Sequence, residues 1–169
     1  MKRENMAFAQ RAESSLLKEF RKPIWRPFMN AVRAYELIKP GDKIAVCISG
    51  GKDSMLLAKL IQLLERYSEV PFEAKYLVMD PGYSPANRRR IEENARLLEI
   101  PVTIFETDIF GVANTAEKNP CYLCARMRRG HLYSQAMALG CNKIALGHHF
   151  NDVIETTVMG MLWAGSCRA

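Results

Sequence analysis

The chain has 169 residues, of which 49% are hydrophobic and 25% are charged. This length suits one domain with its own core, and the balance of charged and apolar residues excludes a disordered chain. No apolar run approaches the roughly 18 residues that span a bilayer, and the charged N-terminus has no signal-peptide hydrophobic region. The sequence thus excludes a membrane protein, a collagen, a coiled coil and a secreted disulfide scaffold, and predicts a cytoplasmic location.

The positive charge is concentrated at the start of the chain. Residues 1–40 contain nine Lys and Arg against four Glu, which is +5 of the total net charge of +6. A basic segment interleaved with aromatic residues suits RNA. A solvated helix face, docked on the body by an apolar stripe, explains the same pattern equally well. Two smaller basic clusters follow, at Arg88–Arg90 and at Arg126, Arg128 and Arg129.

Helices and strands are predicted to alternate after the basic segment. The first two helices are interrupted around Pro23 and Pro27, because proline removes a backbone donor. The run at 43–48 is short, apolar and rich in β-branched residues, which is typical of a buried strand. Residues 108–120 are predicted to be a loop. The expected helices are 6–21, 26–38, 55–67, 88–98, 121–139 and 151–162, and the expected strands are 43–48, 72–79, 102–105 and 143–146.

This alternation predicts an α/β fold in which a parallel sheet carries helices on both faces, preceded by N-terminal helices. Ligands of such sheets bind at the carboxyl ends of the strands. We expect residues 1–39 to form a basic helical segment and residues 40–169 to form a nucleotide-binding domain. Four strands leave one edge of the sheet open, so we expect this domain to be incomplete at its C-terminus.

A glycine-containing loop, Ser49-Gly50-Gly51-Lys52-Asp53-Ser54, follows the first strand. Glycines let the backbone approach an anion closely, and the start of the next helix adds partial positive charge. Lys52 adds a full charge, Ser49 and Ser54 add hydroxyl donors, and Asp53 would suit a phosphate site if Mg²⁺ bridges the two. The loop is neither a Walker A motif nor a Rossmann fingerprint. A glycine-rich turn with a serine helix cap is the simpler alternative.

Five cysteines cannot all pair internally, and the absence of an export signal favours reduced thiols. Cys121 and Cys124 open a helix, near arginines that would lower a thiol pKa. The spacing leaves three interpretations open, namely a metal or iron–sulfur site, a redox dithiol, and two unrelated helix residues. Cys47 is predicted to lie in the core and Cys141 to be structural.

A third motif, Gly147-His148-His149, follows the last strand, and Asp152 opens the helix after it. We expect this segment to face the same crevice as the glycine-containing loop. Gly147 would permit close approach of a nucleotide, and Asp152 could hold Mg²⁺ or order the site. A catalytic role and a structural role remain equally open for His149.

The hexapeptide SGGKDS resembles the PP-loop of the ATP-pyrophosphatase family, whose members cleave ATP between the α and β phosphates. Taken with the C-x-x-C about 70 residues later and the LGHHFND segment, the chain from about Arg26 to Leu162 is similar to the tRNA 2-thiocytidine synthetase group and its 2-thiouridine relatives. The resemblance implies an adenine nucleotide alpha-hydrolase-like (HUP) fold, and a [4Fe-4S] cluster held by three cysteines with one iron free to carry sulfur.

The resemblance also implies roles for individual residues. Asp152 and the two cysteines Cys121 and Cys124 would be catalytic, and these cysteines would be the first two cluster ligands. The third ligand has no evident equivalent, because Cys167 lies only 43 residues after Cys124, which again favours a truncated chain. The implied ATP-binding residues are Ser49, Gly50, Gly51, Lys52, Asp53, Ser54, Asp80, Arg128 and Gly147.

The implied activity is ATP-dependent tRNA thiolation by a sulfurtransferase. The C2 carbonyl oxygen of a tRNA pyrimidine would attack ATP·Mg²⁺, and sulfur delivered through the cluster would then replace AMP. Expected partners are tRNA and a sulfur donor such as sulfide or a cysteine desulfurase product, while homodimer formation stays open. The alternatives are a PP-loop ATP pyrophosphatase acting on a small-molecule amide or carboxylate, and a non-catalytic nucleotide-binding or iron–sulfur module.

Overall fold

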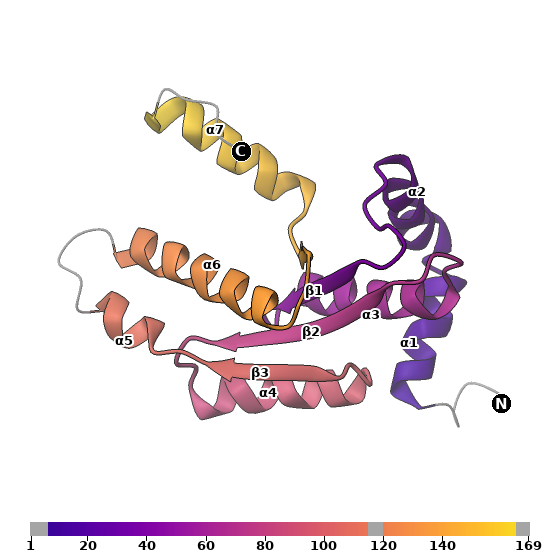
Figure 1. Cartoon of the computed structure of the whole chain (residues 1–169), viewed down its shortest axis with the longest axis horizontal. Coiled ribbons are helices and arrows are strands. Elements are labelled where there is room, and N and C mark those ends of the chain that lie inside the picture. The colour runs from indigo at the N-terminus through magenta and orange to yellow at the C-terminus, as the bar shows by residue number, and fades with distance from the viewer. Residues whose placement is uncertain (1–6, 115–119, 165–169) are drawn as a thin grey trace.

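The computed structural model of the chain describes residues 7–114 and 120–164 (Figure 1). A sheet of four strands forms its centre. In chain order the elements are α1 (Phe8–Leu17), the π-helix η1 (Arg21–Trp25), α2 (Arg26–Ala34), β1 (Lys43–Ile48), α3 (Lys52–Tyr67), β2 (Glu73–Asp80), α4 (Pro85–Leu97), β3 (Val102–Glu106), α5 (Ile109–Asn114), α6 (Pro120–Ala138), β4 (Lys143–Leu146) and α7 (Phe150–Ala164).

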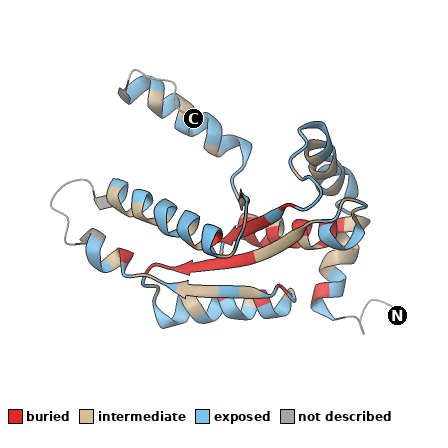
Figure 2. Ribbon diagram, in the orientation of Figure 1, coloured by how far each residue is buried: buried red, intermediate tan, exposed pale blue. Residues whose placement is uncertain are grey.

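The sheet is parallel throughout, in the order β3-β2-β1-β4. Alternate residues of β1 serve opposite faces, as the two-residue period of a strand requires. Val46 packs with α3 and α4 residues on one face, whereas Ala45 packs with Ala136 of α6 on the other. The buried residues follow β1, β2 and α3 (Figure 2). The predicted α/β fold with helices on both faces is therefore confirmed.

Helix α7 extends away from the sheet (Figure 1). Its large apolar side chains are exposed, with Phe150 at 76% and Trp163 at 94%. None of the described helices combines the length and the apolar content needed to cross a bilayer.

The N-terminal segment docks on the body by an apolar stripe. Leu16 of α1 is buried against Leu60 and Leu63 of α3. The break between the first two helices falls at residues 18–20, not at the prolines. Pro23 is accommodated inside η1, where the N–H groups of Ile24 and Trp25 both donate to the Phe20 carbonyl. A helix face docked on the body by an apolar stripe, which was one of the two interpretations of the basic segment, is thus present.

A buried ion pair reinforces this docking. Lys59 of α3 is 2% exposed, and its Nζ lies 2.8 Å from Oε1 of Glu13 in α1. The same ammonium donates to Oε1 of Gln62 and to the carbonyl of Leu98, each at 2.8 Å. Three donated bonds satisfy the ammonium fully. One lysine therefore joins α1, α3 and the end of α4, and the sequence analysis gave no sign of it.

The prediction of a loop at 108–120 was wrong for its first half, because residues 109–114 form α5. Tertiary contacts explain the helix. Ile109 is fully buried, and the Phe110 N–H donates to the Pro81 carbonyl at 2.9 Å. The Phe110 ring also meets Tyr83 edge-on at 6.1 Å. The rest of the predicted loop, residues 115–119, lies outside the described residues.

Tyr76 offers a direct stability test. The residue is 3% exposed, its hydroxyl has no hydrogen-bond partner among the described residues, and burial raises the pKa of the phenol. A buried unsatisfied polar group costs about 1–3 kcal/mol. Tyr76→Phe is therefore expected to raise the free energy of unfolding by about 1 kcal/mol in urea titration. Tyr35→Phe, at an exposed residue, is the control and should change nothing; an equal or lower stability for Tyr76→Phe would contradict the prediction.

Candidate functional site

The loop after β1 has a conformation that only glycine fits. Gly50 has φ +88°, in the left-handed region that favours glycine. A Cβ atom at this residue would also lie 2.7 Å from Cγ1 of Ile91 in α4. Gly51 follows as the N-cap residue of α3, so the loop ends at the positive end of a helix. Backbone N–H groups are thereby presented at the carboxyl edge of the sheet.

The Ser54 hydroxyl holds this loop together. Its Oγ donates to the Gly51 carbonyl at 2.9 Å and accepts from the Ser49 N–H at 3.2 Å. The Ser49 hydroxyl donates to the same oxygen at 3.2 Å. The serine-cap alternative is wrong, because Gly51 caps α3 without any side-chain hydrogen bond. Ser54 is buried and acts as an internal brace, whereas Ser49 is exposed.

Asp53 pairs with its neighbour Lys52. The Lys52 Nζ lies 2.9 Å from Oδ2 of Asp53, and this contact lowers the pKa of the carboxyl group. The lysine side chain is 86% exposed. Asp53 therefore has a charge partner, Lys52, within the loop itself. The Lys52 side chain extends into solvent, where it is free to move.

A cavity of about 340 Å³ lies beside this loop, and its lining includes residues of the loop, of the Gly147-His148 segment and of α6 after the paired cysteines. The loop forms one wall, the turn after β4 forms another, and α6 forms the third. No Asp or Glu is among the described residues that line it. The lining residues are Cys47, Ile48, Ser49, Ser54, Met79, Ala125, Arg128, Arg129, Leu132, Tyr133, Leu146, Gly147 and His148.

The paired cysteines lie on the side of α6 that faces this cavity. Residues three or four apart share one face of a helix. Cys121 stands four residues before Ala125, and Cys124 stands four residues before Arg128, both of which line the cavity. Cys121 is exposed and Cys124 is half-buried. The thiols therefore border the cavity one helical turn beyond the residues that line it.

The two thiols supply only part of a cluster site. They are one turn apart at the start of a helix, which suits two ligands of one metal centre. In the ranges 7–114 and 120–164, no group of three His, Cys, Asp or Glu side chains is arranged to hold a metal ion. Cys167, the residue considered as a third ligand, lies outside the described residues. The ligand set in view is thus compatible with a cluster but incomplete.

Gly147 packs closely against the phosphate loop. A Cβ atom there would lie 2.8 Å from both the Cα and the backbone nitrogen of Ser54. The space that a side chain would need at this residue is filled by the phosphate loop, and Gly147 also lines the cavity. Gly147 lets the turn after β4 pack directly on the start of α3, which fixes two walls of the cavity against each other.

Gly147→Ala is therefore expected to destabilise the chain by about 1–3 kcal/mol, the usual cost of overpacking, because a backbone contact cannot yield as a flexible side chain can. Urea unfolding measures this change. Gly130→Ala in α6 is the matched control, since a Cβ there meets nothing within 4 Å. A helical glycine without steric constraint should gain about 0.5–1 kcal/mol on this change. Equal behaviour of the two variants would contradict the role given to Gly147.

Asp152 organises the turn before α7. Its Oδ2 accepts the His149 N–H at 2.8 Å and lies 3.4 Å from Nδ1 of the same residue. The Asp152 N–H in turn donates to the His149 carbonyl at 3.1 Å. This reciprocal arrangement is typical of an acid that caps a helix start. Asp152 and His149 therefore have a local structural role, and the side chains remain partly exposed.

Asp80 and Arg88 form a separate network at the ends of β2 and β3. Oδ1 of Asp80 accepts the N–H groups of Gly82 and Tyr83, and Oδ2 lies 3.1 Å from Nη1 of Arg88. Burial alone would raise the pKa of Asp80, but these partners outweigh it and lower the pKa. Asp80 does not line the 340 Å³ cavity, so the two groups of predicted ATP ligands face different hollows.

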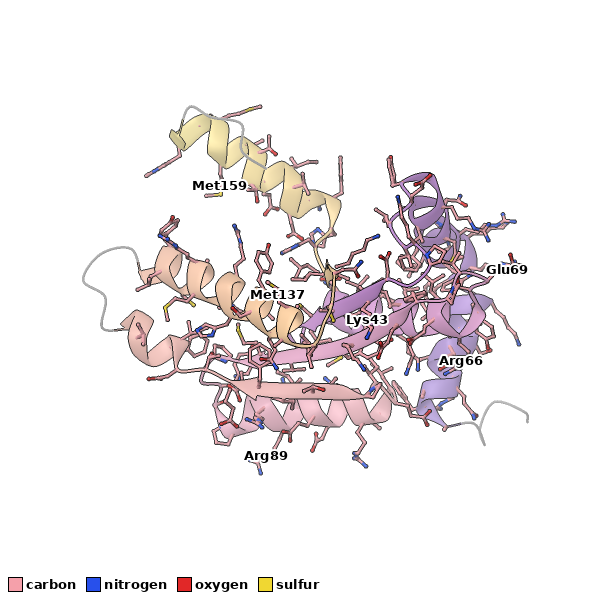
Figure 3. All side chains as sticks on the ribbon, in the orientation of Figure 1. Lys43, Arg66, Glu69, Arg89, Met137 and Met159 are labelled. Carbon is pink, nitrogen blue, oxygen red and sulfur yellow. The ribbon has the colours of Figure 1, made fainter. Side chains whose placement is uncertain are left out.

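Within the basic cluster Arg88–Arg90, Arg88 takes part in further ion pairs. Its guanidinium also pairs with Glu106 and, at 3.0 Å, with Glu92. Arg89 and Arg90 are exposed, and Figure 3 shows Arg89 projecting outward from α4.

The sequence analysis did not assign several cavity-lining residues. Arg129, Leu132 and Tyr133 of α6 could have been found by extending the helical stripe that begins at the cysteines. Cys47 was correctly predicted to be buried, and burial raises the pKa of its thiol to about 11. Its place in the cavity floor depends on tertiary packing and had no sequence signal.

The chain matches a known family model and several curated proteins. The PP-loop domain model covers residues 16–167. The tRNA-cytidine(32) 2-sulfurtransferase of Geotalea uraniireducens (strain Rf4) is 37% identical over 142 residues, which is 82% of this chain and 56% of that protein. The enzyme of the same name from Geotalea daltonii is 36% identical over 160 residues, 93% of this chain and 62% of that protein. The chain spans a little over half the length of these relatives.

Solved structures agree with this assignment. The U34-tRNA thiolase NcsA from Methanococcus maripaludis, solved with its [4Fe-4S] cluster, has a TM-score of 0.62 and 27% identity, covering 78% of this chain and 45% of NcsA. The NH3-dependent NAD synthetase of Campylobacter jejuni is 17% identical with a TM-score of 0.50, covering 83% of this chain and 72% of the synthetase, and shares the fold. The phosphate loop, the sheet and the cavity of this chain have the form described above. Because the family model also spans nine-tenths of the chain, the chain belongs to the PP-loop domain family.

Proposed function

We propose that the protein takes part in ATP-dependent tRNA thiolation, as a tRNA sulfurtransferase of the ATP-pyrophosphatase type. The observation that carries this proposal is the cavity shared by the phosphate loop and the cysteine-bearing face of α6. An enzyme that activates a base with ATP and then replaces oxygen by sulfur needs both groups at one site. The relatives named as tRNA-cytidine(32) 2-sulfurtransferases support a cytidine as the target.

In the first step, residues 49–54 would bind the β and γ phosphates through backbone N–H groups, Lys52 and the Ser49 hydroxyl. The C2 carbonyl oxygen of the base attacks the α phosphorus, and pyrophosphate leaves. Lys52, Arg128 and a Mg²⁺ ion held near Asp53 or Asp152 would stabilise the charge that develops on the departing group. Gly147 would contribute indirectly, by holding the turn after β4 against the loop.

The second step exchanges oxygen for sulfur at C2. Cys121 and Cys124 would hold an iron–sulfur cluster, which supplies a sulfur nucleophile when bound. Attack at C2 expels AMP together with the original oxygen, leaving a thiocarbonyl. Sulfide would replenish the sulfur directly, and the persulfide product of a cysteine desulfurase would do so after a two-electron reduction by a thiol. Asp152 holds the turn that carries His148 into the cavity, so this acid would order the site even without touching substrate.

The RNA would lie against the basic N-terminal segment, residues 1–39. Arg21, Lys22, Arg26 and Arg33 are exposed there, while the apolar side of the same segment is docked on α3. Exposed positive charge on an anchored helical segment suits a phosphate backbone, and such binding weakens with salt. The setting implied is cytoplasmic, where tRNA and reduced thiols coexist.

Product analysis with the cluster-reconstituted full-length protein under anaerobic conditions tests this proposal. ATP, sulfide and unmodified tRNA should yield pyrophosphate and 2-thiocytidine in parallel, and omission of tRNA should suppress pyrophosphate release. Pyrophosphate release without RNA, on addition of small amides or carboxylates, would favour the alternative PP-loop enzyme. ATP binding with no pyrophosphate release under any condition would overturn the proposal in favour of a non-catalytic nucleotide-binding module.

A further inference from the structure

We propose that Arg129 is a second arginine for the phosphate chain of the nucleotide, acting beside Arg128; this inference rests on the proposed function. Both residues belong to the cavity-facing side of α6. They share the lining of a cavity of about 340 Å³ with Ser49 and Ser54 of the phosphate loop. Its size and its place beside the loop suit part of a nucleotide.

The charge of the cavity points to an anionic occupant. Among the described residues that line it, Arg128 and Arg129 are the permanently charged ones, and none is an Asp or Glu. Two guanidinium groups without a nearby carboxylate repel each other, and an anion between them relieves that repulsion. The Lys52 ammonium, in contrast, is paired with Asp53 and directed into solvent. The positive charge facing the loop therefore comes from α6.

The state of two other cations, Lys59 and Arg88, strengthens this argument. Lys59 is paired with Glu13, and Arg88 is paired with Asp80, Glu92 and Glu106. Within the described part of the chain, neither Arg128 nor Arg129 takes part in a hydrogen bond or an ion pair. Arginines left unpaired on the wall of a cavity, beside a phosphate loop, are the ones available to a ligand.

The position of Arg129 along α6 assigns it to the nucleotide rather than to RNA. Four residues further along the helix, Tyr133 lines the same cavity, and Leu132 lies beside it. Arg129 thus stands within the cavity-lining stripe, not at its outer end, where the cysteines lie. An arginine fork at this place can hold two phosphate oxygens at once.

Nucleotide-binding measurements on the 169-residue chain test the assignment. The probes are α,β-methylene ATP, which is not cleaved between these phosphates, and unmodified bulk tRNA. Arg129→Ala should weaken binding of the ATP analogue about tenfold or more, the usual scale of a charge-assisted hydrogen bond. The affinity of Arg129→Lys for the analogue should lie between those of the unmodified chain and of Arg129→Ala, because lysine keeps the charge but loses the planar fork of the guanidinium. Arg126→Ala is the matched control, because Arg126 is exposed on the same helix and does not line the cavity.

Five outcomes separate the possibilities. A selective loss of analogue binding in Arg129→Ala, with an unchanged thermal midpoint, supports the assignment. Analogue binding equal to that of the unmodified chain overturns it, as does an equal loss in Arg126→Ala, which would mean a general charge effect. Loss of tRNA binding alone overturns it in favour of an RNA contact. If the unmodified chain does not bind the analogue at all, the proposed function fails before the role of Arg129 is reached.

Discussion

Cys124→Ala is expected to lower 2-thiocytidine formation at least about 100-fold while pyrophosphate release continues. Cys124 stands one helical turn before Arg128, which lines the cavity, whereas the substitution leaves the phosphate loop untouched. Even outer partners of a metal site are each worth about 10–100-fold, so a direct ligand should matter at least as much. Lys52→Ala should instead lower both products about 100-fold, because it removes charge stabilisation from the first step.

The measurement is a paired assay of pyrophosphate and thiolated nucleoside, with iron and sulfide counts as an activity-independent readout. Cys124→Ala should lose iron and sulfide, whereas Lys52→Ala should retain both. Cys141→Ala is the matched control: this half-buried cysteine follows the C-terminal end of α6 and does not line the cavity, and its loss should change neither product. Full thiolation by Cys124→Ala would refute the role given to the paired cysteines.

Glu13→Ala is expected to cost about 3 kcal/mol of unfolding free energy. The change removes the carboxylate partner of Lys59, a buried ammonium that keeps only neutral partners, the Gln62 side chain and the Leu98 carbonyl. Removing one member of a buried ion pair costs about 3–5 kcal/mol, because the remaining charge is left uncompensated. Glu13→Ala/Lys59→Met should recover part of the loss, since the buried charge is then gone.

Urea unfolding of the two single variants and the double variant gives the coupling energy of the pair. Glu93→Ala serves as the control, because this glutamate is exposed on α4 and surface changes are usually within about 0.5 kcal/mol. An additive double variant would show that the pair contributes nothing specific.

The same pair predicts a dependence of stability on pH. Burial would raise the pKa of Glu13, but Lys59 and Arg66 outweigh it and hold the pKa below its usual 4.5. A carboxyl group whose pKa is depressed by folding stabilises the protein above its unfolded pKa. That contribution is lost as the pH falls below about 4.5 and through the folded pKa. The acid sensitivity of the unmodified chain should therefore exceed that of Glu13→Ala/Lys59→Met.

Local patterns determined much of this protein. The apolar run at 43–48 and the run at 143–146 form the strands predicted for them, because short buried β-branched runs leave few alternatives. The SGGKDS loop could also be recognised from its local pattern, because Gly50 needs a positive φ and the following helix supplies an N-terminus. The helical stripe on α6 already contained Arg128 and, in retrospect, Arg129.

Tertiary packing decided the features that depend on contacts between residues distant in the sequence. Lys59 pairs with Glu13 across 46 positions of the chain, and α5 forms because Ile109 and Phe110 reach β2 and the turn after it. Gly147 packs on the loop backbone because β4 lies beside β1 in the sheet order. A sequence fixes which residues prefer a helix, a strand or a turn, but the partner that fills the space beside each one depends on how the layers stack.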